Sequence, residues 1–106
     1  MSEEYNGWAN RETWAFVLHC DNTIGTESML ESLGYLTHDI VHAKESDDYA
    51  MGREVLSFVE DMWDDDPSAD WVRLMRDDVG SVWRIDLREI GAWAREYAKE
   101  SVRYAS

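Results

Sequence analysis

The sequence predicts an all-α protein: a single-domain, irregular or orthogonal bundle of about five helices formed by residues 1–106. Apolar residues recur every three or four positions along most of the chain, which is the spacing of one buried helix face. Residues that cap helices or form turns stand between these stretches. The 106 residues are 44% hydrophobic and include six tryptophans, which is enough apolar material for one core.

Two helices are expected in the first half of the chain. The first covers residues 11–20, where the Asn10 side chain can accept a hydrogen bond from the first turn. The second runs from a cap at Thr26 to about residue 44, although Gly34 weakens its middle. The apolar face of the first helix consists of Trp14, Val17 and Leu18. That of the second consists of Met29, Leu30, Leu33, Leu36, Ile40 and Val41.

Two further helices are expected in the centre. The third begins at the capping residue Ser46, and residues 64–67, three aspartates and a proline, end it. Ser68 then caps a shorter fourth helix, which stops at Gly80 because a glycine readily takes the left-handed conformation of a helix end. The third helix presents Met51, Val55, Phe58, Val59 and Met62 to the core. The fourth presents Trp71, Leu74 and Met75.

A fifth helix follows a linking stretch at residues 82–85, which is compatible with a short extended segment. Asp86 and Glu89 resemble a capping box, in which each side chain accepts a hydrogen bond from the backbone N–H of the other. The helix should run nearly to the C-terminus and bury Ile90, Trp93, Ala94 and Tyr97. Its basic stripe consists of Arg88, Arg95, Lys99 and Arg103. Glutamates flank this stripe, and cations suit the end of a helix dipole, so direct nucleic-acid binding is not expected.

The chain is strongly acidic, with 23 Asp and Glu residues against 10 Lys and Arg and a formal charge of −13. Residues 60–78 carry eight acids and two bases, whereas residues 84–106 carry four acids and five bases. The negative electrostatic field of these acids opposes binding to nucleic acid or to an anionic membrane, and it favours binding to a basic partner. The sequence shows no signal peptide and no long apolar segment, so we expect the protein in the cytoplasm.

The acids of residues 54–78 are the candidate partner-binding residues, and we call them the acidic surface. Carboxylates three or four positions apart on a helix lie about 5–6 Å apart, the same order as the spacing of phosphates along a nucleic-acid strand. The surface is therefore a candidate nucleic-acid mimic, with plain solubility as the alternative. Its members are Glu54, Glu60, Asp61, Asp64, Asp65, Asp66, Asp70, Asp77 and Asp78.

One pattern resembles a zinc motif but is incomplete. His38 and His42 are four residues apart with an aspartate next to the first, similar to the HExxH arrangement. A third ligand, His19 or Cys20, would have to converge on them from another helix. We expect an exposed histidine pair here, and Cys20, the only cysteine, as a small core residue.

A second pattern resembles the first half of a calcium-binding EF-hand loop. Its alternating residues are Asp64, Asp66, Ser68 and Asp70. Ala69 and Met75 occupy the positions where such a loop needs Gly and a bidentate Glu, so a solvated turn is expected instead. Neither a metal nor a cofactor is predicted. The sequence has no recognisable pairing of a nucleophile with a base, and we do not expect an enzyme.

Residues 6–14 read Asn-Gly-Trp-Ala-Asn-Arg-Glu-Thr-Trp. They resemble the opening motif N-G-W-x-N-x-E-T-W of a family of small proteins carried by phages and other mobile elements. Residues 83–90 more weakly resemble the closing Trp-x-Glu-Ile helix of that family. Size, acidity and motif together also resemble type I-E anti-CRISPR proteins of Pseudomonas mobile elements. The motif residues themselves indicate a structural role as bend, cap and core anchors: Gly7, Trp8, Asn10, Glu12 and Trp14.

The resemblance implies an anti-defence protein acting in the host bacterial cytoplasm. The expected partner is a basic surface of a type I CRISPR-Cas surveillance complex or of its helicase-nuclease, bound stoichiometrically by the acidic surface. No small-molecule substrate and no membrane partner are expected. One alternative is a phage regulatory or structural protein that docks through apolar or aromatic surface, with acidity serving solubility only. Another is a metal-dependent hydrolase that uses His38 and His42.

Overall fold

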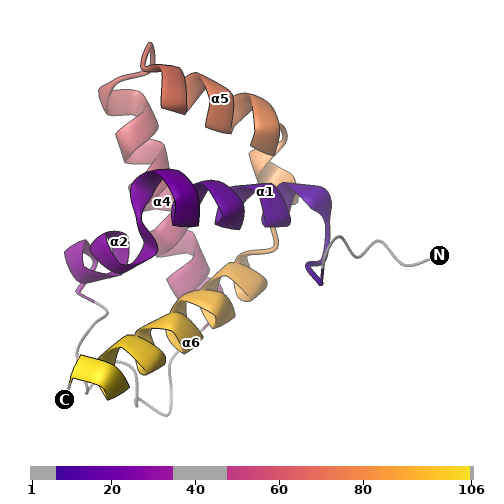
Figure 1. Ribbon diagram of the computed structural model, residues 1–106. Helices are drawn as coiled ribbons and strands as arrows, with labels where there is room; N and C mark the ends of the chain where they lie inside the picture. Colours follow the sequence, from indigo (N-terminus) through magenta and orange to yellow (C-terminus); the bar gives the residue numbers. More distant parts are fainter. Residues whose placement is uncertain (1–6, 35–47, 106) are drawn as a thin grey trace.

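The computed structural model describes residues 7–34 and 48–105 (Figure 1). Those residues form five α-helices: α1 (Arg11–His19), α2 (Thr26–Ser32), α4 (Asp48–Asp65), α5 (Asp70–Val79) and α6 (Leu87–Ala105). A π-helical turn (Cys20–Ile24) follows α1, and a 3-10 turn (Val82–Arg84) connects α5 with α6. The described residues contain no strand, which confirms the all-α prediction.

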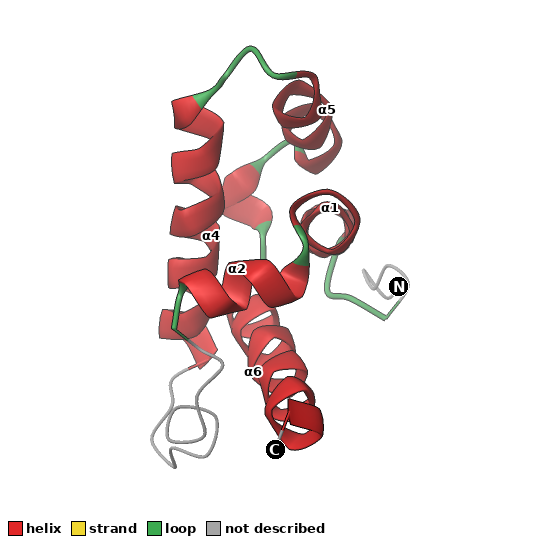
Figure 2. Ribbon diagram, turned by 60° about the vertical axis from the view of Figure 1, so that its left-hand side comes forward, coloured by secondary structure: helices red, strands yellow, loops and turns green. Residues whose placement is uncertain are grey.

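The helices cross one another as an irregular bundle. The principal pair is α4 with α6, and α1 lies between α5 and α6 on the same side of α4 (Figures 1 and 2). Helix α2 follows the π-helical turn and contacts α6. Each described helix contributes completely buried side chains to one core, among them Phe16, Met29, Leu30, Val55, Val59, Val72, Met75, Val79, Ile90 and Ala94.

Two glycines allow α4 and α6 to approach closely. A Cβ added to Gly52 of α4 would overlap the backbone carbonyl of Leu87, and a Cβ added to Gly91 of α6 would overlap that of Asp48. Both obstacles are backbone atoms, so a side-chain rotation cannot relieve them. The Asp48 carboxylate also forms an ion pair with Arg95 across the same crossing.

The capping predictions have different outcomes. Asn10 caps α1, because its Oδ1 accepts the Thr13 N–H at 2.9 Å. The prediction for Thr26 is wrong: α2 begins at Thr26 itself, and its buried hydroxyl donates to Asp21 Oδ1 at 2.5 Å. The prediction for Ser68 is also wrong, because Ala69 precedes α5 and the Ser68 hydroxyl donates to Asp66 at 3.4 Å. In both cases the hydroxyl donates a hydrogen bond to a nearby aspartate and does not cap the helix.

The predicted second helix is shorter than expected. It ends at Ser32, and Gly34 has φ +78°, a left-handed conformation that stops a helix. The remaining predictions for this region, the stripe residues Leu36, Ile40 and Val41 and the cap at Ser46, lie outside the described residues. The stop at Gly80 is confirmed by its φ of +71°. Residues 82–84 form a 3-10 turn, and not the short extended segment with which the sequence is compatible.

Some buried faces differ from the prediction. Leu18 is 38% exposed and Leu74 is 65% exposed, although both were expected in the core. On α1 the buried set instead includes Thr13, Ala15 and Phe16, because α5 and α6 cover the helix from two sides. On α5 the buried residues are Val72, Met75 and Val79, which share one face and leave Leu74 on the other. On α4, Met51, Val55 and Val59 are buried as expected, together with Trp63.

Candidate functional site

All nine residues of the acidic surface are exposed. Glu54, Glu60, Asp61, Asp64 and Asp65 lie on α4, Asp66 lies in the following turn, and Asp70, Asp77 and Asp78 lie on α5. Among the described residues, the two helices and their turn contain ten acids and three arginines. The surface therefore carries a strongly negative local field, and its members divide into groups with different surroundings.

The first group is the α4 stripe, which consists of Glu54, Asp61 and Asp65. These residues are seven and four positions apart, so they share one line along the helix. A rise of 1.5 Å per residue separates them by about 10 Å and about 6 Å along the helix axis. Asp61 and Asp65 form no ion pair with any described residue. Asp61 and Asp65 are thus uncompensated negative charges on the α4 stripe.

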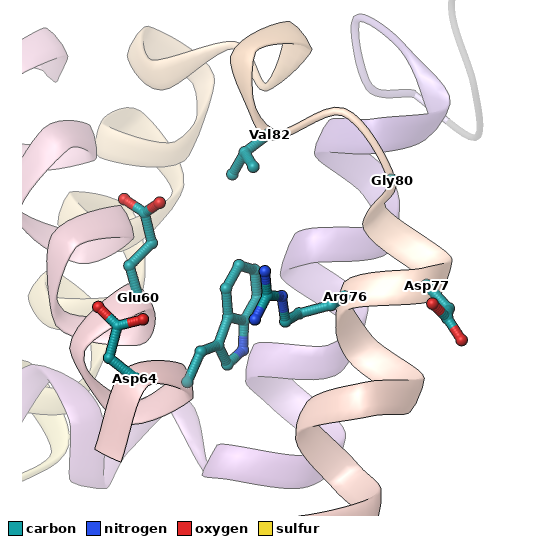
Figure 3. Close-up of a pocket in the computed structure, with 7 residues that line it drawn as sticks. Glu60, Asp64, Arg76, Asp77, Gly80 and Val82 are labelled. Atoms are coloured by element: carbon teal, nitrogen blue, oxygen red, sulfur yellow. The ribbon is translucent and has the colours of Figure 1, made fainter. Parts of the chain in front are cut away.

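Glu60 and Asp64 belong to a second group, which faces a pocket between α4 and α5 (Figure 3). The α4–α5 pocket has a volume of about 330 Å³ and is lined by Glu60, Trp63, Asp64, Arg76, Asp77, Gly80 and Val82. The Arg76 guanidinium lies 5.7 Å from the centre of the Trp63 ring, a cation–π contact. Figure 3 shows the Asp77 carboxylate turned away from Glu60 and Asp64.

Asp78 has a structural role that the sequence did not indicate. Its carboxylate lies 2.7 Å from His19 Nε2 and 3.8 Å from the Arg11 guanidinium. Its backbone carbonyl also accepts a hydrogen bond from Arg11 at 2.5 Å. Asp78 therefore joins α5 to both ends of α1, and its carboxylate already has partners within the protein.

The N-terminal motif residues join the start of α1 to the start of α6. Gly7 has φ +89°, which permits the bend before the helix. Glu12 pairs with Arg84 at 3.5 Å, and the Asn10 side-chain amide donates to the Arg84 carbonyl at 2.7 Å. Trp8 and Trp14 are half-buried against the core. These contacts support the structural interpretation of the motif.

Thr13 and Glu89 complete this junction through tertiary contacts that the sequence pattern does not predict. The buried Thr13 hydroxyl donates to Asn10 Oδ1 at 2.7 Å and accepts the Asp86 N–H at 2.8 Å. Asp86 does cap α6, since its Oδ1 accepts the Glu89 N–H at 3.1 Å. The reciprocal half of the predicted capping box is wrong, because Glu89 instead accepts the Ala9 N–H at 2.8 Å. The segments that resemble an opening and a closing motif are therefore in contact.

One aromatic side chain lies almost wholly in solvent. Trp83, in the 3-10 turn, is 83% exposed, and the Arg84 guanidinium lies 5.8 Å from the centre of its ring. Large aromatic residues usually bury most of their surface, and tryptophan is enriched among the residues that contribute most to protein interfaces. Trp83 is therefore a second candidate contact, separate from the acidic surface.

The candidate metal ligands do not come together in the described part of the chain. His38 and His42 lie outside it, His19 pairs with Asp78, and Cys20 is fully buried. Desolvation, and secondarily the Asp21 carboxylate, raise the pKa of the Cys20 thiol far above its usual range. No cluster of three or more possible metal-binding residues occurs within residues 7–34 and 48–105, and this includes the EF-hand-like run.

The predicted basic stripe of α6 is partly neutralised. Arg95 pairs with Asp48, and Lys99 lies 3.6 Å from Glu96. Arg88 is exposed, whereas the Arg103 side chain lies outside the described part. Among the helices described, none is both long and apolar enough to cross a membrane.

Residues 1–100 match the model of a protein family whose description is "Family of unknown function (DUF7249)". No curated protein and no solved structure matches the chain. The family supplies no reaction, ligand or partner, so the function has to be inferred from the residues and their surroundings.

Proposed function

The chain belongs to DUF7249, a family of unknown function, and we propose from the charge of its surface that the protein binds a basic, nucleic-acid-binding surface of another protein and thereby inhibits that protein. The observation that supports this proposal most directly is the α4 stripe. Its carboxylates are exposed, and Asp61 and Asp65 have no neutralising partner among the described residues. Like charges held together oppose folding, and a cationic partner would relieve that repulsion.

The geometry of the stripe suits a surface that normally holds a nucleic-acid backbone. Carboxylates about 6 Å and about 10 Å apart on a rigid helix can approach several lysine or arginine side chains at once. Phosphate-binding surfaces present such side chains in rows. The bound protein would then exclude nucleic acid from that surface, without any reaction being catalysed.

Among proteins with such nucleic-acid-binding surfaces, we propose a component of a type I CRISPR-Cas system as the partner. This component is either the surveillance complex or its helicase-nuclease. The resemblance of the N-terminal motif to proteins of phages and mobile elements supports this choice. Inhibition would be stoichiometric and would take place in the cytoplasm of the host bacterium.

A binding assay with purified surveillance complex and helicase-nuclease, each with and without target DNA, tests the proposal. The wild-type protein should bind one of them and compete with DNA. Asp61→Lys with Asp65→Lys should weaken binding by at least about tenfold, since two attractive contacts become repulsive, and added salt should weaken the wild-type complex.

Glu27→Lys with Glu31→Lys provides the matched control. These two exposed acids are also four residues apart, but they lie on α2 and not on the helices that carry the acidic surface. The control should bind like the wild type although its net charge changes by the same amount. Equal binding by both double variants would contradict a role for the α4 stripe.

The exposed Trp83 favours a second candidate function, a phage regulatory or structural protein that docks through an aromatic contact. In that case binding would be insensitive to salt, and Trp83→Ala would abolish it while Asp61→Lys with Asp65→Lys would not. The same assay therefore distinguishes the two candidates.

A further inference from the structure

We draw no further inference here: the strongest candidate, the exposed Trp83 ring on the 3-10 turn between α5 and α6, carries none because nothing in the described part of the chain shows what covers it.

Discussion

Thr13 illustrates how one buried hydroxyl can connect two distant segments. It lies in the first turn of α1, yet its oxygen accepts the N–H of Asp86, 73 residues later in the chain. The same hydroxyl donates to Asn10, so the cap of α1 and the start of α6 share one hydrogen-bonded group. The motif threonine is therefore explained by a tertiary contact and not by helix propensity, which is low for threonine.

Thr13→Val should destabilise the fold. Valine has the same shape but leaves the Asp86 N–H without its acceptor, which should lower the free energy of unfolding by about 1–3 kcal/mol. Urea denaturation followed by tryptophan fluorescence measures this change. Thr13→Ser keeps the hydroxyl and loses only a methyl group, so its smaller cost, about 1 kcal/mol, is the control. A valine variant as stable as the serine variant would show that the hydroxyl contributes little.

At the scale of elements, the crossing of α4 and α6 dominates the packing. Gly52 and Gly91 each lie directly against a backbone carbonyl of the opposite helix. Glycine is unfavourable within helices by about 1 kcal/mol relative to alanine, so its presence here is explained by the close approach that it permits. The crossing holds α4 in place and thereby positions the acids of its exposed side.

Gly52→Ala should therefore destabilise the protein although alanine is the better helix former. The new methyl group meets backbone atoms of Leu87, so the two helices must separate, at a cost of about 3 kcal/mol or more. Chemical denaturation provides the measurement. Ser57→Ala, on the exposed side of α4, is the control and should change stability by less than about 0.5 kcal/mol. A Gly52→Ala protein as stable as the wild type would rule out the close crossing.

At the scale of the molecule, the charge of −13 affects stability as well as recognition. The ten acids and three arginines of α4, α5 and their turn lie on neighbouring helices, so repulsion acts between elements as well as within them. Ion pairs such as that of Asp78 with Arg11 offset only part of this repulsion. Salt should screen the remainder, because the Debye length falls from about 30 Å at 0.01 M to about 8 Å at 0.15 M.

The melting temperature should consequently rise when salt is added. About 1 kcal/mol of relieved repulsion would raise Tm by about 4–8 °C in a domain of this size. Thermal unfolding followed by circular dichroism at low and moderate sodium chloride concentration measures the effect. In low salt, the Asp61→Asn with Asp65→Asn variant should have a higher Tm than the wild type. Added salt should then raise its Tm by less than it raises that of the wild type. A Tm that stays constant or falls with salt would mean that attractive ion pairs outweigh the repulsion.

The amino-acid sequence determined the features that depend on neighbours along the chain. The apolar periodicity predicted helices, Asn10 and Asp86 marked two helix starts, and Gly80 marked a helix end. These signals are local because a cap or a glycine acts within one turn of its own helix. The exposure of the acidic residues was equally predictable, since uncompensated charges are rarely buried.

The tertiary structure decided what depends on residues far apart. It left Leu18 and Leu74 exposed, because the burial of a helix face is set by the helices that cover it. It also assigned different surroundings to acids that look alike in sequence: Asp78 binds α1, whereas Glu60 and Asp64 face a pocket. Periodicity specifies which residues share a face of one helix, but only the packing of helices specifies what that face meets.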